Sequence, residues 1–120
     1  MNKIYHLSSC TTCQRILEET GAGKKGIVLQ DIKTEKISPE QLDELKEKAG
    51  SYEALFSRRA IKYKELGLKD QQLVEADYRR LILEEYTFLK RPVALIRGTV
   101  FAGNDKKTVS ALGDALTKKR

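Results

Sequence analysis

Apolar side chains recur with two different periods along the first part of the chain. Residues 3–7, KIYHL, are typical of a short β-strand. The next apolar side chains repeat at helical spacing: Cys13, Ile16 and Leu17. Gly21 and Gly23 predict the end of this helix, because glycine readily adopts the backbone conformation that closes helices. Residues 26–32, GIVLQDI, alternate apolar and polar side chains and predict a second strand.

A second helix is predicted to begin after residue 38. Residues 38–41, SPEQ, combine a serine N-cap, a proline at the first helical position and the glutamine of a capping box. Leu42, Leu45 and Ala49 then share one helical face, and Gly50 predicts the end of the helix.

The rest of the chain divides at Pro92 into a helical block and a hairpin. Residues 52–89 show helical segments with almost no strand signal. Their apolar side chains are Leu55, Phe56, Leu66, Leu73, Tyr78, Leu81, Ile82 and Tyr86. Residues 93–97, VALIR, and 99–103, TVFAG, predict a tight hairpin around Gly98. A last helix is predicted from the spacing of Val109, Leu112 and Leu116.

The predicted order is β-α-β, a helical block, then β-β-α. The first two strands must be parallel because a helix joins them, whereas the hairpin strands must be antiparallel. This order predicts an α/β fold with a mixed four-stranded sheet, as in thioredoxin-like proteins, with an all-helical insertion at about residues 38–90. A chain of 120 residues suits a single domain over residues 1–120.

The composition indicates where the protein is located but does not identify its partners. The start of the chain has no long apolar run, and no stretch approaches the roughly 20 apolar residues of a membrane span. We therefore expect a soluble, cytoplasmic monomer with no membrane contact. The net charge of +6 permits an anionic substrate or an acidic partner, and by itself does not argue for direct binding of nucleic acid.

The candidate chemistry lies in residues 5–17, YHLSSCTTCQRIL, which hold both cysteines and the one histidine. Cys10 is predicted at a helix N-terminus, where free N–H groups and the helix dipole favour a thiolate. Cys13 lies one turn later, within reach of a disulfide with Cys10. A metal site would need His6 and a carboxylate as further ligands, so no metal is predicted. Two interpretations of the cysteines remain open, a redox-active pair or two side chains that only fill space in the core, because buried cysteine is often inert. His6 is assigned a supporting role.

Four segments in the same order resemble the arsenate reductase family of thioredoxin-like proteins, which includes the branch of the Spx and YffB proteins. IYHLSSCTTCQ (4–14) is similar to the family's strand and cysteine loop. ALFSRRAIKYKELGL (54–68) is similar to the segment in which the family has an arginine before Y-x-x-L. LKRPVAL (89–95) resembles its Arg-Pro motif, and GTVFAGN (98–104) its closing hairpin. Together these motifs span about 110 residues, which makes the resemblance specific.

The resemblance implies roles for individual residues. Cys10 corresponds to the nucleophile, and Arg59 and Arg91 to arginines that bind the oxyanion substrate. Pro92 corresponds to a cis-proline beside the cysteine loop. Thr11 and Thr12, at the helix N-terminus after Cys10, are expected to contact the substrate. Guanidinium groups would hold the oxygens of arsenate and also favour the thiolate.

Two departures from the family pattern leave the function open between an enzyme and a regulator. The family's arsenate reductases carry a third arginine in the final hairpin, where this chain has AGND around Gly103. Cys13 adds a second cysteine, as in the Spx-type regulators. The first hypothesis is a thiol-based oxidoreductase like a glutaredoxin-dependent arsenate reductase. It would bind no cofactor, act on a small oxyanion or thiol substrate, and be reduced by glutathione and glutaredoxin or by thioredoxin. The alternative is a redox-sensing transcriptional regulator in which a disulfide between the cysteines changes binding to RNA polymerase.

Overall fold

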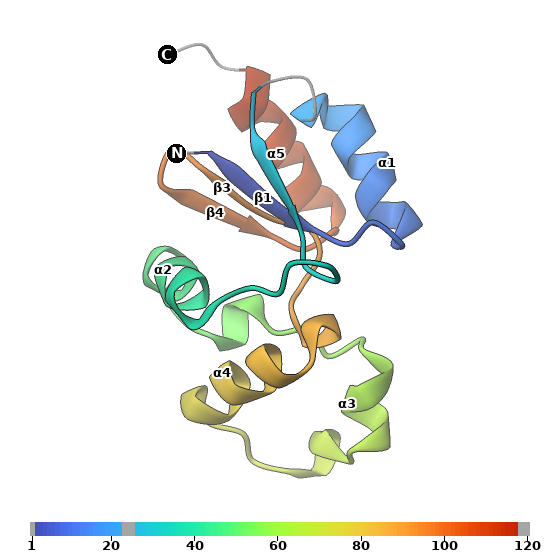
Figure 1. Cartoon of the computed structure of the whole chain (residues 1–120), viewed down its shortest axis with the longest axis vertical. Helices are drawn as coiled ribbons and strands as arrows, with labels where there is room; N and C mark the ends of the chain where they lie inside the picture. The colour runs from blue at the N-terminus through green and yellow to red at the C-terminus, as the bar shows by residue number, and fades with distance from the viewer. Residues whose placement is uncertain (1, 23–25, 118–120) are drawn as a thin grey trace.

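The computed structural model describes residues 2–22 and 26–117, which form a mixed sheet and two groups of helices (Figure 1). The strands are β1 (Lys3–His6), β2 (Val28–Asp31), β3 (Val93–Ile96) and β4 (Thr99–Ala102). The longer helices are α1 (Thr11–Thr20), α2 (Pro39–Ala49), α4 (Glu75–Glu84) and α5 (Lys106–Thr117). Shorter helical turns are η2 (Glu53–Leu55), α3 (Ile61–Glu65), η3 (Leu68–Asp70) and η4 (Tyr86–Phe88). No helix in these two stretches combines the length and apolar character needed to cross a membrane.

The sheet has the strand order β2-β1-β3-β4 and confirms the predicted mixed topology. β1 pairs with β2 in parallel, with Tyr5 opposite Gln30. β1 pairs with β3 antiparallel, with Tyr5 opposite Val93. β3 and β4 form the predicted hairpin, whose turn contains two residues with positive φ, 49° at Arg97 and 81° at Gly98. Both values suit the tight turn that joins right-twisted strands.

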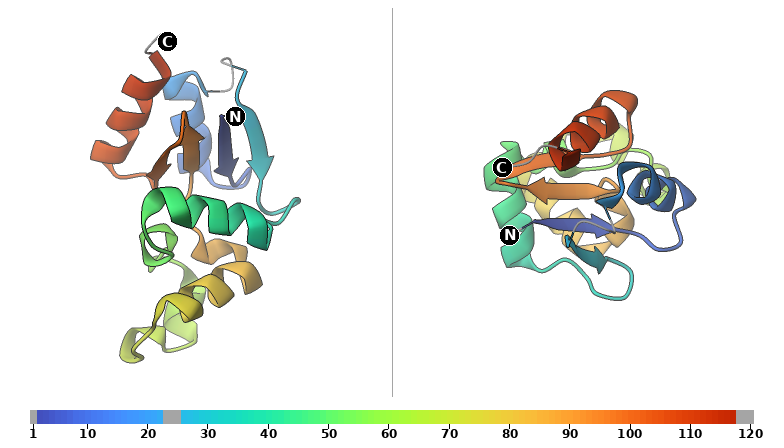
Figure 2. Two further views of the ribbon diagram at one scale, coloured as in Figure 1. Left: turned by 90° about the vertical axis from the view of Figure 1, so that its left-hand side faces the viewer. Right: turned by 90° about the horizontal axis from the view of Figure 1, so that it is seen from above.

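Helices cover the sheet on both faces, and alternate residues of each strand enter different cores. α1 and α5 pack on one face, where their core includes Ile4, Ile16, Ala94, Ile96 and Leu112. On the other face, Tyr5, Leu7, Val93 and Leu95 pack against α2 and the helical block. Figure 2 shows α1 and α5 side by side, with α2 across the opposite side of the sheet. The period of two along a strand therefore divides the apolar side chains between two cores.

Helices α1 and α2 begin and end where the sequence predicts them. Ser38 accepts a hydrogen bond from the Gln41 backbone N–H, and the Gln41 side chain accepts one from the Ser38 N–H, which completes the capping box of α2. Gly21 (φ 71°) closes α1 and Gly50 (φ 101°) closes α2. The other predicted stop, Gly23, lies outside the described residues.

The side-chain alternation predicted for the second strand is wrong, although the strand exists. Gln30 is only 2% exposed, whereas Val28 is 45% and Leu29 39% exposed. β2 lies at the sheet edge, and the Gln30 amide is satisfied by the carbonyl of Glu35 and the side chain of Gln41. Because every polar atom of a buried amide needs a partner, this hydrogen-bond network decides which residue of β2 faces inward.

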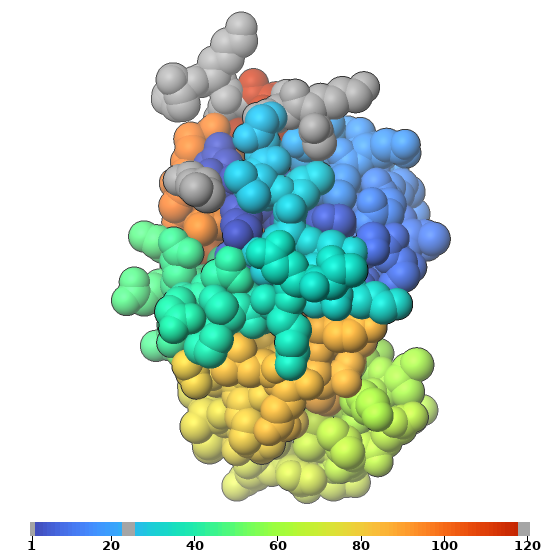
Figure 3. Space-filling view, viewed as in Figure 1, coloured from blue at the N-terminus to red at the C-terminus, as the bar shows by residue number. Residues whose placement is uncertain are grey.

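The helical block packs around aromatic side chains beneath the sheet. Phe56 contacts the rings of Phe88, Tyr78 and Tyr63, with ring centroids 4.9 to 6.0 Å apart. Leu66, one of the apolar side chains of the block, is the C-cap residue of α3 and is 53% exposed. In the space-filling view, the α2 region lies between the sheet half of the molecule and the lower helices (Figure 3).

Candidate active site

Cys10 is the N-cap residue of α1 and is held by its own backbone. Its φ and ψ are −93° and 108°, and its carbonyl accepts the first helical hydrogen bond, from Gln14 N–H, at 3.1 Å. Its N–H donates to the Leu7 carbonyl at 3.0 Å, which closes a tight turn after β1. The thiol is partly exposed, whereas Cys13 is fully buried. The loop therefore presents one accessible sulfur at the end of a helix.

The two thiols have opposite electrostatic environments. Partial burial tends to raise the pKa of Cys10, but the pKa is lowered overall by the backbone N–H and thiol of Cys13, the Arg91 guanidinium and the Thr12 N–H. Burial is the main reason that the pKa of Cys13 is raised, and its hydrogen bond with Cys10 raises it further. Cys13 therefore stays protonated and donates to the Cys10 thiolate, while the Leu7 N–H bonds to the Cys13 sulfur.

Arg91 is close enough to Cys10 to favour its charged form. Its Nη1 donates to the Thr87 carbonyl at 2.9 Å, which fixes one side of the guanidinium. Its Nε is buried and has no hydrogen-bond partner among the described residues. The peptide bond between Arg91 and Pro92 is cis, as the family resemblance implied. A buried donor without a partner is costly, so an anion bound here would satisfy it.

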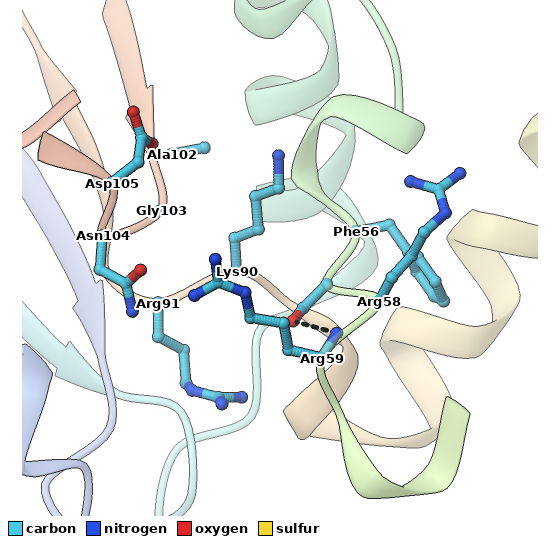
Figure 4. Close-up of a pocket in the computed structure, with 10 residues that line it drawn as sticks. Phe56, Arg58, Arg59, Lys90, Arg91, Ala102, Gly103, Asn104 and Asp105 are labelled. Carbon is cyan, nitrogen blue, oxygen red and sulfur yellow. Dashed lines mark hydrogen bonds between the residues drawn. The ribbon is translucent and has the colours of Figure 1, made fainter. Parts of the chain in front are cut away.

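Arg91 also lines a cavity of about 300 Å³ whose walls come from three segments (Figure 4). These are residues 56–59, residues 90–91 and residues 102–105. Cys10 is not part of this lining, so Arg91 is the residue that the cavity and the cysteine loop share. The site thus combines a reactive sulfur near Arg91 with a cationic cavity that Arg91 also lines.

The predicted arginine at position 59 lies in the cavity wall, and its neighbour does not act in the same way. The Arg59 side chain is exposed and makes no ion pair or hydrogen bond within the described ranges. Arg58 also touches the cavity, but it binds the Glu53 carboxylate at 2.7 Å and the Tyr78 hydroxyl at 3.0 Å. The Arg59 guanidinium is therefore available to bind an anion, whereas the Arg58 guanidinium is already bound to Glu53 and Tyr78 within the helical block.

The two threonines after Cys10 occupy different positions. Thr11 is exposed at the first position of α1, while the Thr12 backbone N–H points at the Cys10 sulfur and Thr12 is partly buried. Neither residue lines the cavity. Their predicted substrate contacts would have to be made outside the cavity, near Cys10.

His6 supports the cysteine loop together with residues that the sequence did not single out. Gln14 Nε2 donates to the Leu7 carbonyl at 3.0 Å and contacts His6 Nδ1 at 3.2 Å. On β2, the Asp31 carboxylate accepts from the Ser8 hydroxyl at 2.5 Å and from the Ser8 N–H at 3.3 Å. The Ser8 hydroxyl is the main cause of the lowered pKa of Asp31. Only the parallel pairing of His6 with Asp31 brings Asp31 to this loop, so no local pattern could have revealed it.

Lys90 is the other functional candidate that sequence reasoning missed. It precedes Arg91, lines the cavity and makes no ion pair within residues 2–22 and 26–117. The charge run Lys90-Arg91 was its only signal in the sequence. Across the same two stretches, no group of three or more His, Cys, Asp or Glu side chains is placed to hold a metal. The chemistry available here is that of a thiolate and several cations.

The sheet order, the cysteine at the start of α1 and the cis-proline before β3 define a thioredoxin-like protein. The chain belongs to the ArsC family, whose model matches residues 5–112. No curated protein sequence matches it. Among solved structures, a YFFB protein is 23% identical with a TM-score of 0.78, and the match covers 98% of this chain and 100% of that one.

Two further structures carry arsenate reductase in their descriptions. An arsenate reductase from Vibrio cholerae is 26% identical with a TM-score of 0.71, covering 92% of this chain and 96% of that chain. An arsenate reductase (ArsC) related protein from Brucella melitensis is 22% identical with a TM-score of 0.70, covering 92% of each chain. The match over nearly the whole chain extends to the sheet, the helical block and the hairpin.

Proposed function

We propose that this protein is a thiol-dependent reductase in which the Cys10 thiolate attacks a small anionic substrate held by Arg91 and Arg59. The observation that carries this proposal is the pairing of a lowered pKa at Cys10 with a neighbouring Arg91 whose buried Nε lacks a partner. One cation thereby activates the sulfur and carries an unpaired N–H that an oxygen of the substrate would satisfy. Membership of the ArsC family makes arsenate the first substrate to test.

The proposed reaction proceeds through a bond between the Cys10 sulfur and the substrate. With arsenate, the thiolate bonds to arsenic and an arsenate oxygen leaves as water after protonation. A second thiol then attacks the Cys10 sulfur, and the electron pair of the sulfur–arsenic bond goes to arsenic, which leaves as arsenite. The two thiols have become a disulfide, so the electrons balance. A disulfide substrate would react similarly, with one of its sulfurs leaving as a thiolate.

The second thiol comes either from Cys13 or from glutathione. The hydrogen bond between Cys13 and Cys10 supports an internal disulfide, but the raised pKa of Cys13 makes it a poor nucleophile until it loses its proton. Glutathione would react without that cost, and glutaredoxin would then remove it from Cys10. Thioredoxin is the corresponding reductant for a disulfide between Cys10 and Cys13.

The test is a coupled assay with arsenate, glutathione and glutaredoxin, compared with the same assay using thioredoxin. We expect turnover by the wild type, none by Cys10→Ser, and a loss of about a hundredfold in kcat/KM for Arg91→Ala. Arg80→Ala is the matched control, because Arg80 is exposed and pairs with Glu84 on α4. Equal losses in Arg91→Ala and Arg80→Ala, or turnover by Cys10→Ser, would contradict the proposal.

The contact between the two thiols favours a redox-sensing regulator as the second candidate. In this case mild peroxide would form the disulfide between Cys10 and Cys13, and dithiothreitol would reverse it. Rapid disulfide formation without turnover of arsenate or a disulfide substrate would replace the reductase by this regulator. Pull-down of RNA polymerase by the oxidised and reduced forms would then test its partner.

A further inference from the structure

Gly103 leaves one wall of the cavity without a side chain, and Lys90 occupies the space beside it. Gly103 has a φ of 105° and its N–H donates to the Pro92 carbonyl at 2.9 Å, so the end of β4 is fixed next to the Lys90 segment. A Cβ at position 103 would lie 3.7 Å from Lys90 Cδ. The aliphatic part of Lys90 therefore lies against the glycine, and a long side chain at 103 would compete with it.

The backbone of Lys90 is held in place by the helical block. The Lys90 N–H donates to the Leu55 carbonyl at 2.8 Å, and the Ser57 N–H donates to the Phe88 carbonyl at 2.7 Å. These bonds lie on either side of the bridge between Phe56 and Leu89. They bring the segments that carry Lys90 and Arg59 to the same cavity. Figure 4 shows Lys90 and Arg91 leaving their segment on opposite sides, so the two cations serve different parts of the site.

The carboxylate in the cavity lining, Asp105, lies near Lys90: its pKa is lowered mainly by hydrogen bonds from Thr108 and to a smaller extent by the charge of Lys90. Asp105 Oδ2 accepts from the Thr108 N–H at 3.2 Å and Oδ1 from the Thr108 hydroxyl at 2.7 Å. These bonds make Asp105 the cap of α5, and Lys90 forms no ion pair with it. Among the described residues, Lys90, Arg59 and Arg91 thus line one cavity with a single carboxylate that is ion-paired with none of them, which leaves an excess of positive charge there.

We propose that Lys90 is a specificity-determining residue that binds an anionic group of the substrate in the cavity beside Gly103. This inference rests on the proposed reductase function and extends it. Because Cys10 does not line the cavity, the oxygens bound by Lys90 and Arg59 are those on the part of the substrate that faces away from the Cys10 sulfur. The ligand chemistry is an oxygen anion, either a tetrahedral oxyanion or a carboxylate, and lysine binds both as a point charge.

The test measures anion binding by nuclear magnetic resonance in the full-length protein. The backbone amides of Gly103, Asn104 and Ser57 are followed during titrations with sulfate and, separately, acetate at constant ionic strength. Thiols do not reduce sulfate, so this readout is independent of turnover. We expect saturable shifts, with Lys90→Met raising the apparent Kd about fivefold, because an ionic hydrogen bond is lost while the packing of the stem is kept. Lys90→Arg should stay within about twofold of the wild type.

The matched control is Lys62→Met, because Lys62 is exposed on α3, in the same helical block, and pairs with Glu65. An equal rise in Kd for Lys62→Met, an unchanged Kd for Lys90→Met, or no saturable shift with either anion would overturn the proposal. Tighter binding of sulfate than acetate identifies an oxyanion site, and comparable binding identifies a carboxylate site. Sulfate binding that depends on Lys90 in a protein without reductase turnover would refute only the proposed function.

Discussion

Replacing Cys13 by alanine should raise the pKa of Cys10 and slow its reaction with electrophiles near neutral pH. The buried Cys13 thiol donates to the Cys10 sulfur, and this bond is stronger when Cys10 is charged. A hydrogen bond to a charged group contributes about 1.5–3 kcal/mol, and one pKa unit corresponds to about 1.4 kcal/mol. Because Cys10 is partly exposed, solvent weakens the bond, and we expect the pKa to rise by about one unit. Cys13→Ser keeps a donor and should give less than half of this shift.

The assay is the rate of Cys10 alkylation by iodoacetamide as a function of pH, followed by mass spectrometry of the peptide that contains Cys10. This readout avoids the tyrosines, which interfere with ultraviolet detection of thiolates. In the wild type, the rate should rise with a midpoint below about 8.5, the value for an unperturbed thiol. The reasoning fails if Cys13→Ala leaves the midpoint unchanged, or if Cys13→Ser and Cys13→Ala shift it equally.

Two further predictions concern stability. The lowered pKa of Cys10 should add stability above the unfolded thiol pKa of about 8.5, and this contribution is lost as the pH falls through the folded pKa. The raised pKa of Cys13 acts in the opposite sense: its contribution to stability is present below about 8.5 and is lost as the pH rises through the folded pKa. In urea unfolding against pH, Cys13→Ser, which keeps Cys10, should therefore become more stable as the pH rises toward about 8.5. Cys10→Ser, which keeps Cys13, should become less stable above about 8.5. Asp31→Ala should remove the acceptor for Ser8, lower the free energy of unfolding by about 1 kcal/mol and slow Cys10 alkylation, whereas Asp31→Asn should retain most of both. Unchanged alkylation in Asp31→Ala would show that the Ser8 contact does not position the loop.

The order of elements along the chain and the ends of α1 and α2 could be predicted because local signals determine them. The proline and capping residues at 38–41 place the start of α2, and the short turn at Gly98 forces an antiparallel hairpin. The inward position of Gln30 could not be predicted, because it depends on Gln41 and on carbonyls that only the folded chain brings near. Likewise, Cys10 and Arg91 were found from motifs, whereas Asp31 and Lys90 depend on contacts between segments distant in sequence.

The sheet itself explains why these distant segments meet. β1 and β3 are antiparallel with Tyr5 opposite Val93, so the chain leaving β1 toward Cys10 lies beside the chain that enters β3 through Arg91. β2 runs parallel to β1, so Asp31 at its C-terminal end lies at the same end of the sheet. β4 is antiparallel to β3, and Ala102 opposite Val93 places Gly103 there as well. Each of the four strands therefore has one of its two ends at the same end of the sheet, where the site lies. The helical block joins the same end of the sheet through Lys90, whose N–H donates to the Leu55 carbonyl of that block.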